Sequence, residues 1–409
     1  MPEFSQKIFY ANSDFEFASV ACDCEVDVTH PSKGVTKHIF RLYPKEDTIY
    51  YAYIAERGLV SKNKDGALNG RAVLPDLLAI QNGDAKAVKA FIEQHGFFLP
   101  LDPNEDNAID AELLFGLINR LKATVALMSA LGEPKTDYKR VLGLTLYLLL
   151  SSTIEIQLPN FQSPFYTCIH DVGQAWNGVY VINESVLRVE DVGYNVDEGL
   201  SIQDSVRPPE TWLTASEYSD AIGYEQFDLS GTRANATYLF RNAITATPSC
   251  RLAIGLLYHF CKEVGDIKSW NHKGDLMFVD TPPTAAQFRE MFDESLQTAL
   301  LALAKDTLKT ELEFNLNGIV PSYETETMTP SWHVEYLLAG LYFSVFYMRP
   351  KIELYRTCAN PNCRLPFLVR TTSSKQKYCK SACANAMAQR NHRRKIKSQI
   401  TENEPTPTS

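Results

Sequence analysis

The sequence predicts an α+β protein with a β-rich N-terminal region, a large mainly helical body and a small cysteine-bearing module near the C-terminal end. Three observations support this fold class. Apolar and polar residues alternate up to about residue 60, apolar residues recur at three- and four-residue steps after about residue 70, and four cysteines form two close pairs beyond residue 357. We divide the chain into three parts and a Thr- and Pro-rich tail that should be disordered, namely residues 1–80, 81–349, 350–400 and 401–409.

The first part should form antiparallel strands. Residues 7–60 are rich in Phe, Tyr, Val and Ile, and they alternate in segments such as 16–20 and 48–54. The turn-forming run Pro31-Ser32-Lys33-Gly34 interrupts them. We therefore expect strands on either side of this run.

The body should be mainly helical, with a mixed region in its middle. Pro248 separates two helical patterns, and Pro282-Pro283 precedes another. Short strands such as residues 178–182 are expected within 158–209, and residues 312–323 should be irregular or extended. The expected helices cover residues 85–95, 108–131, 138–151, 235–246, 249–264, 284–310 and 334–348.

The composition is that of a packed globular protein. Of the 409 residues, 45% are hydrophobic and 22% charged, which excludes a mainly disordered or collagen-like chain. The most apolar uncharged stretches, residues 141–154 and 336–348, fall short of the roughly 18 residues that a membrane-spanning helix needs, so no membrane partner is expected. Residues 1–13 include Glu3 and Lys7 and lack an apolar secretion segment, so we expect a cytoplasmic protein with its nine cysteines reduced.

Charge is divided unevenly along the chain. The net charge is −9, from 40 basic and 49 acidic residues, yet residues 351–400 hold twelve of the basic residues and a single acid, Glu353. Residues 1–350 hold 28 basic and 46 acidic residues, and so carry a charge of −18. Such asymmetry is typical of a basic nucleic-acid-binding appendage on an acidic body, because the appendage releases counterions from phosphates while the body repels them. The alternative is a solvated basic segment without a partner.

Four cysteines in the basic segment have the spacing of a metal site. Four residues separate Cys358 from Cys363, three separate Cys379 from Cys383, and fifteen lie between the pairs. In a reducing compartment, two close pairs indicate a tetrahedral Zn(Cys)4 site, which is structural because four thiolates leave no position for water. Four unrelated core cysteines are the alternative. A module this small has little core, so zinc should supply its folding free energy.

The segments around the cysteines predict a treble-clef-like zinc finger, with a knuckle, a hairpin and a helix in that order. Residues 365–370 should form one strand of the hairpin, and residues 375–379 the returning strand. Ser381 should cap a helix that runs to about residue 399. Cys383 falls in the first turn of this helix, where the helix dipole favours the thiolate.

Basic side chains on and before this helix are the expected nucleic-acid-binding residues. Four of them, within residues 390–397, follow the i, i+3, i+4, i+7 pattern and so share one stripe of the helix. Their natural use is phosphate contact, and Gln389, Asn391 and His392 could reach base edges, with solvated side chains as the alternative for each. The expected nucleic-acid-binding residues are Lys375, Lys377, Lys380, Arg390, Arg393, Arg394 and Lys397.

Phe367, Asn385 and the run at residues 389–394 accompany the four cysteines. Together they resemble the CGNR-type zinc finger of bacterial proteins proposed to be transcription regulators. The resemblance covers residues 332–397 at most. The motif that gives the family its name would read Cys-Gly-Asn-Arg, whereas this chain has Cys-Ala-Asn-Ala from Cys383, so no role of that arginine transfers. The resemblance implies a zinc-dependent DNA-binding module, and relatives often carry a ligand-sensing domain before the finger.

The sequence predicts a regulatory protein that binds nucleic acid, DNA first, through its finger, while the acidic body senses a ligand or protein partner or forms a homo-oligomer. Three alternatives stay open. The chain could be an RNA-binding or ribosome-associated protein, a protein-interaction module whose finger docks on an acidic surface, or an enzyme with an accessory finger. The sequence contains no glycine-rich phosphate loop, no His-Glu-x-x-His motif and no nucleophile elbow, which favours a protein that is not an enzyme.

Overall fold

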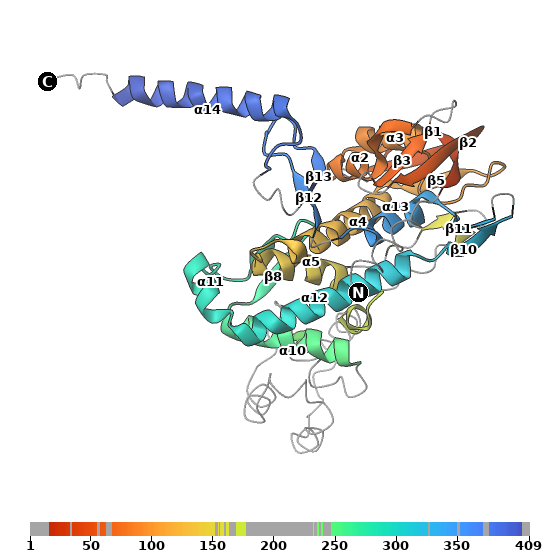
Figure 1. Ribbon diagram of the computed structural model, residues 1–409. Coiled ribbons are helices and arrows are strands. Elements are labelled where there is room, and N and C mark those ends of the chain that lie inside the picture. The colour runs from red at the N-terminus through yellow and green to blue at the C-terminus, as the bar shows by residue number, and fades with distance from the viewer. Residues whose placement is uncertain are drawn as a thin grey trace, which may run out of the picture.

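A twisted sheet, a set of long helices across the middle and one helix extending outward near the C-terminus make up the molecule, seen as a computed structural model in Figure 1. The mixture of strands and helices confirms the α+β class. Side chains beyond residue 393 are not described. The structure describes residues 16–32, 35–54, 58–62, 68–151, 154, 156–158, 161–162, 169–176, 232, 235–236, 239, 247–325, 328–349, 352–370 and 376–402.

An antiparallel sheet occupies the N-terminal part. Its long hairpin consists of β1 (Glu16–Ser32) and β2 (Val35–Ile54), which lie on either side of residues 33–34 in the predicted Pro- and Gly-containing run. Two further strands, β3 (Gly58–Lys62) and β5 (Asn107–Asp110), pair with separate stretches of β2, and β4 (Leu68–Ala72) pairs with β3. The sheet therefore takes one strand from beyond residue 80. The predicted strand residues before residue 16 lie outside the described part.

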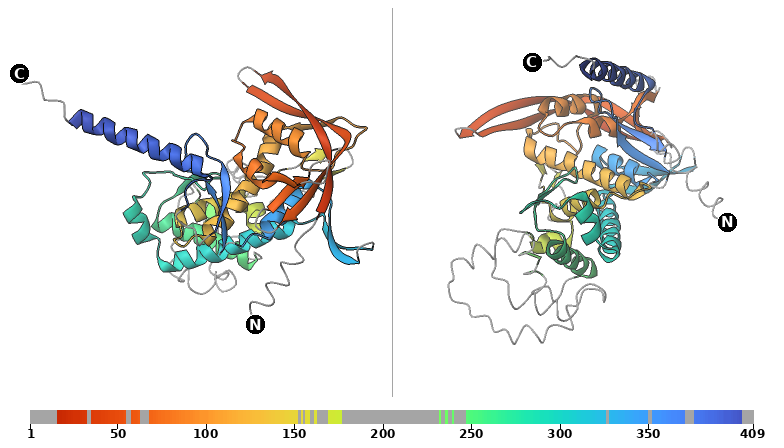
Figure 2. Two further views of the ribbon diagram at one scale, coloured as in Figure 1. Left: turned by 45° about the horizontal axis from the view of Figure 1, so that its top comes forward. Right: turned by 90° about the vertical axis from the view of Figure 1, so that its left-hand side faces the viewer.

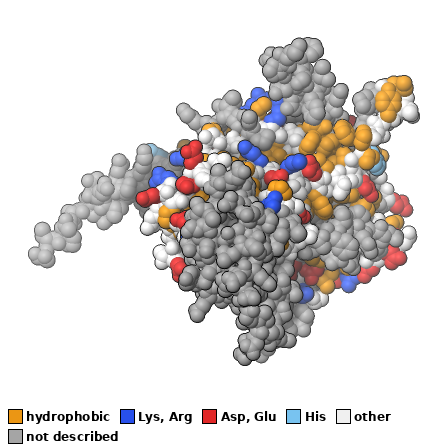
Figure 3. All heavy atoms as spheres, turned by 90° about the horizontal axis from the view of Figure 1, so that it is seen from below, with side chains coloured by type: hydrophobic (Ala, Val, Ile, Leu, Met, Phe, Trp, Pro, Cys, Tyr) orange, Lys and Arg blue, Asp and Glu red, His pale blue; other side chains and the backbone are white. Residues whose placement is uncertain are grey.

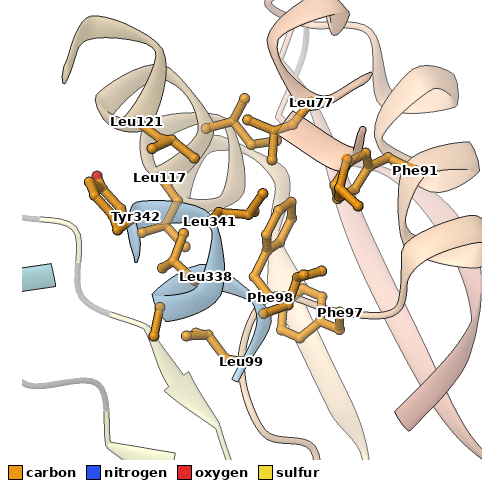
Figure 4. Close-up of a cluster of buried hydrophobic side chains, with 14 of the residues drawn as sticks. Leu77, Phe91, Phe97, Phe98, Leu99, Leu117, Leu121, Leu338, Leu341 and Tyr342 are labelled. Atoms are coloured by element: carbon orange, nitrogen blue, oxygen red, sulfur yellow. The ribbon is translucent and has the colours of Figure 1, made fainter. Parts of the chain in front are cut away.

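Three helices pack with this sheet around a first hydrophobic core. They are α2 (Val73–Ala79), α3 (Ala85–His95) and α13 (Leu337–Phe346). α13 comes close to β1 at Gly340, where an added Cβ would lie 2.6 Å from the ring of Phe17, so the helix needs a glycine there. Figure 4 shows side chains meeting in this core, among them Leu77, Phe91, Phe97, Phe98, Leu99, Leu117, Leu121, Leu338, Leu341 and Tyr342.

Helix α4 (Ala111–Gly132) runs between this core and a second one. Leu114 and Leu121 face the first core, whereas Ala123 and Leu127 belong to the second. By length and composition α4 could cross a membrane, but 72% of its apolar stretch is buried inside the molecule, as befits a helix shared by two cores. The elements around the second core are α5 (Tyr138–Leu150), α10 (Pro248–Glu263), α11 (Ala285–Met291), α12 (Glu294–Asn315), β8 (Ile267–Trp270) and β9 (Leu276–Phe278).

Short hairpins complete the body. β10 (Ile319–Glu324) and β11 (Thr329–Val334) form a hairpin that projects from the side of the molecule in both views of Figure 2. After α5 in the chain, two strands of two residues each, β6 (Gln157–Leu158) and β7 (Phe161–Gln162), pair with each other. In the view from below in Figure 3, acidic and basic side chains are interspersed over the described surface, beside an area of exposed hydrophobic side chains.

Two of the helices predicted from apolar periodicity have other boundaries in the structure, because a capping aspartate begins a new helix within each. Residues 284–310 form two helices, because the Asp293 side chain accepts a hydrogen bond from Leu296 N at 2.8 Å and begins α12. Residues 108–131 begin as strand β5, and Asp110 then caps α4 by accepting from Glu112 N at 2.8 Å. Apolar spacing continues across both breaks, so periodicity alone did not reveal them. Most of the predicted helix at 235–246 and the strand at 178–182 lie outside the described part.

A buried charged group joins α4 to α12 between the two cores. Glu311 is fully buried, and its carboxylate accepts from Arg120 Nε at 2.9 Å and also contacts Arg120 Nη2. His170 Nε2 lies 2.8 Å from the same carboxylate, and Arg120 Nη2 donates to Leu148 O at 2.9 Å. Burial alone would raise the pKa of Glu311, but Arg120 and His170 hold it below its ordinary value. The carboxylate therefore stays charged at neutral pH.

Replacing Glu311 by Ala should lower the free energy of unfolding by about 3–5 kcal/mol, because the guanidinium of Arg120 would be left buried without its partner. Urea denaturation followed by circular dichroism measures the loss. Glu313→Ala is the matched control, since that exposed carboxylate pairs with Lys309 on the surface and its loss should cost less than about 1 kcal/mol. Equal losses in the two variants would contradict the role of the buried group.

Candidate metal centre and basic helix

The finger is built on a hairpin whose two strands flank the first cysteine pair. β12 (Glu353–Thr357) pairs antiparallel with β13 (Pro366–Arg370), and the chain between them forms the knuckle. The prediction of a returning strand at residues 375–379 was wrong for its described part, because residues 376–380 are not in a strand. The buried side chains of Leu354 and Val369 lie opposite each other in the register, and this apolar pair selects β12 as the partner. The polar residues after 375 offer no such pair.

The structure brings the four predicted cysteine ligands to one point. The sulfur atoms of Cys358, Cys363, Cys379 and Cys383 all lie within 4.8 Å of one another. The Sγ atoms of Cys363 and Cys379 are 3.5 Å apart, and those of Cys379 and Cys383 are 3.8 Å apart. Zinc–sulfur bonds of about 2.3 Å in a tetrahedron place sulfurs about 3.8 Å apart, so the cluster has the size of a zinc site.

Backbone turns hold the first pair of sulfurs in the knuckle. The carbonyl of Asn360 accepts hydrogen bonds from Cys363 N at 2.9 Å and from Arg364 N at 3.0 Å, and its side-chain oxygen accepts from Asn362 N at 3.1 Å. Arg364 adopts a left-handed backbone with φ of 48°, which turns the chain into β13. Cys358 N donates to Leu365 O at 2.9 Å and closes the base of the knuckle.

The second pair of sulfurs comes from Cys379, just before α14 (Ser381–Glu402), and from Cys383 in its first turn. Ser381 is the first helical residue rather than the cap that we predicted, since the carbonyl of Lys380 already accepts from Cys383 N at 3.1 Å. Cys383 lies in the first turn, as expected. Ala359 N donates to Lys377 O at 2.9 Å, which ties the knuckle to the segment that leads into the helix.

Electrostatics in the cluster favour a bound cation. Burial and the neighbouring sulfurs of Cys363 and Cys358 raise the pKa of Cys379 to about 12. The pKa of Cys383 is raised as well: burial and the sulfurs of Cys363 and Cys358 raise it, whereas hydrogen bonds with the side chains of Asn360 and Cys379 act the other way. The lowered pKa expected from the helix dipole is not found. For Cys358, burial acts upward, but hydrogen bonds from Cys379 and Asn360 lower its pKa. Four thiolates this close repel one another, and a divalent ion among them removes that cost.

The hairpin of the finger is joined firmly to the body. Leu354 is fully buried, Tyr355 N donates to Ser129 Oγ at 3.2 Å, and Arg356 binds both carboxylate oxygens of Glu133 through Nη2 at 2.7 and 2.9 Å. Ser129 and Glu133 belong to the C-terminal end of α4 and its cap. The charge of Arg356 is therefore used to hold the finger in place.

The basic helix itself points away from the body. Figures 1 and 2 show α14 extending outward from the finger, with the C-terminal end farthest from the sheet and helices. Every side chain from Ala388 to Arg393 is exposed. Of the predicted nucleic-acid-binding residues, Lys377, Lys380, Arg390 and Arg393 are exposed, Lys375 lies outside the described residues, and the side chains of Arg394 and Lys397 are not described although their backbone is helical.

Comparison with known proteins agrees with this geometry at the finger. Residues 355–395 match the family model of the CGNR zinc finger, which confirms the resemblance seen in the sequence. The matched segment contains all four cysteines and most of the exposed part of α14. No curated protein and no solved structure matches the chain.

Two structural contributors escaped the sequence reasoning. Asn360 organises the knuckle, and the Asn-Pro-Asn run from Asn360 was a local signal that could have indicated it. Glu133 anchors the finger through Arg356, but these two residues lie far apart in the sequence, so no local pattern links them. Such a contact between residues distant in the sequence is seen only in the folded structure.

Cys379→Ser should release the metal, because a serine hydroxyl at this position replaces one of four thiolates and leaves an incomplete tetrahedron. Metal analysis of the purified protein should give about one zinc per wild-type chain and well under half of that for the variant. Cys250→Ala is the control, since this buried thiol lies in α10, outside the cluster, and should leave the zinc content unchanged. A variant at Cys379 that keeps its full zinc content would contradict the assignment.

Proposed function

We propose that the chain is a cytoplasmic regulatory protein that binds nucleic acid, DNA first, through its zinc finger. One observation carries the proposal: an exposed basic helix starts at the metal cluster and extends away from an acidic body. The metal-bound knuckle would fix where α14 begins and thus where its cations are presented. The body would serve as a sensing or oligomerisation unit.

The charge distribution supports contact with a polyanion along α14. Residues 351–400 carry twelve basic residues and one acid, while residues 1–350 carry a charge of −18. A duplex would be repelled by the body and attracted by the helix, so the favoured approach leaves the body away from the phosphates. The 22 residues of α14 span about 33 Å, which is enough to lie across a groove.

Side chains along the helix suggest a division of work. Arg390 and Arg393 are three positions apart and so share a face, where they would contact phosphates. Gln389, Asn391 and His392 are exposed between and beside them, with the amide and ring groups that read base edges. Lys377 and Lys380 lie just before the helix and would add phosphate contacts there.

Replacing Arg390, Arg393 and Arg394 by Ala should weaken binding to duplex DNA while zinc stays in place. If all three contact phosphates, the slope of log K against log salt should fall by about 2–3, since each contact contributes about 0.9. Fluorescence anisotropy of a labelled duplex, measured at several salt concentrations from about 50 to about 200 mM, gives this slope.

The matched control is the triple variant Lys268→Ala, Lys305→Ala and Lys309→Ala, which removes the same charge from exposed positions of the body. This variant should bind as the wild type does. If both triple variants lose the same affinity, only net charge matters. Wild-type affinity in the arginine variant would show that the helix is not the binding surface.

Duplex DNA should compete for the protein more strongly than structured RNA at the same salt concentration. An α-helix enters the major groove of B-form DNA, whereas the major groove of A-form RNA is too deep and narrow for side chains to read. Competition of unlabelled duplex DNA and hairpin RNA against the labelled duplex gives the ratio of affinities. Stronger competition by RNA would favour an RNA-binding or ribosome-associated function instead.

A further inference from the structure

A cavity of about 370 Å3 lies where the finger meets the body. It is bounded by residues of α2, α4 and α5, by the turn between β8 and β9, and by the hairpin of the finger. This volume falls in the range of small-molecule sites. Five basic residues line it: Lys122, Arg140, His272, Lys273 and Arg364.

Positive charge in this cavity is not neutralised by its walls. The lining residues include no Asp or Glu, although the body as a whole is acidic. Arg356 also lines the cavity, and its charge is compensated by Glu133. Within the described part of the chain, Lys122, Arg140, Lys273 and Arg364 form no ion pair. Uncompensated cations on several elements converge on one space.

The turn that carries two of these residues is built rigidly. Asn271 accepts from Lys273 N at 2.9 Å and from Asp275 N at 3.1 Å through its side-chain oxygen. Gly274 has φ of 86° and packs directly on α5, where a Cβ added to Gly143 would lie 2.3 Å from the carbonyl oxygen of Gly274. The two glycines thus let the turn sit against α5 and bring its basic side chains to the cavity.

Burial in this region acts against the positive charges. Burial, with help from Lys273, lowers the pKa of Lys122 to about 8. Burial and then Lys122 and Lys273 lower the pKa of His272 to about 4, although Asp275 in the same turn acts the other way. The Lys122 ammonium donates a hydrogen bond to the carbonyl of Ile80, which orients it but does not balance its charge. A bound anion would supply the missing negative charge.

The cavity also offers apolar and neutral polar surface. Leu78, Val125 and Pro366 line it, beside the amides of Gln81 and Asn82. A ligand with a charged group at one end and a small organic part at the other would use both kinds of wall. Arginine and lysine groups that approach from several directions suit a phosphate group, with its several oxygens, better than they suit a ligand with a single carboxylate.

We propose that this cavity binds a small phosphate ester, with its phosphate among Lys122, Arg140, Lys273 and Arg364. The ligand would touch both the body and the finger, because Arg364 directly follows the ligand cysteine Cys363. Any effect of the ligand on DNA affinity rests on the function proposed above. The binding itself does not, and it can be measured without nucleic acid.

Titration of the full-length zinc-loaded protein with pyrophosphate, followed by isothermal calorimetry, tests the proposal. The wild type should show saturable binding at one site per chain. The double variant Lys122→Met and Lys273→Ala should bind at least tenfold more weakly, and Lys273→Ala alone, at an exposed position, should weaken binding without risk to the core. The double variant Lys305→Ala and Lys309→Ala on α12 removes the same charge elsewhere and should bind as the wild type does.

Absence of saturable pyrophosphate binding by the wild type would overturn the proposal. It would also be overturned if Lys273→Ala and the double variant Lys122→Met and Lys273→Ala both bound pyrophosphate as tightly as the wild type. A second arm repeats the titration with the labelled duplex. If the cavity variants lose affinity for the duplex as strongly as for pyrophosphate, the cations belong to the nucleic-acid surface, and the small-molecule site is refuted. Full duplex affinity in these variants, with pyrophosphate binding lost, is the expected result.

Discussion

The convergence of four cysteine sulfurs on one point determines the fold of the finger, from β12 to the start of α14. Two sulfurs come from a knuckle between β12 and β13, one comes from just before α14 and one from its first turn, and all lie within 4.8 Å of one another. Four thiolates at that separation repel one another, while four protonated thiols hold the chain only weakly. A divalent ion resolves this conflict, and by doing so it determines where the basic helix begins.

The second determinant is the attachment of the finger to α4. Leu354 is buried, and Arg356 donates hydrogen bonds from Nη2 to both carboxylate oxygens of Glu133. The hairpin therefore has apolar support that an isolated finger would lack, so zinc is not the sole source of order in this module. β12 is held against α4, whereas α14 extends outward, so the described cations of the helix lie outside the acidic body. The junction of finger and body also contains the basic cavity.

Sequence reasoning recovered the features that depend on near neighbours. The two cysteine pairs, the helix at residues 85–95 and the β1–β2 hairpin each follow from local spacing or alternation, and the structure contains them. Partners distant in the chain were not accessible in this way. Strand β12 pairs with β13 because Leu354 and Val369 share one apolar environment on the body, and the sequence near residue 375 gives no sign of that choice.

The same limit applies to charges. Glu311 and Arg120 meet from two helices, α12 and α4, that lie far apart in the sequence. The cavity likewise brings together Lys122, Lys273 and Arg364 from three separate elements. Counting charges along the sequence identified the basic segment but neither the buried ion pair nor the basic cavity. Both depend on residues that become neighbours only when the chain folds. Breaks such as the one at Asp293 were missed for a related reason, because a cap acts at one residue while periodicity averages over many.

X-ray absorption at the zinc edge, on protein purified from cells without added metal, tests the central claim most directly. A zinc ion coordinated by four sulfurs at about 2.3 Å is the predicted result. Protein that carries no zinc, or zinc surrounded by nitrogen and oxygen ligands, would contradict a metal-held finger and with it the presentation of the basic helix.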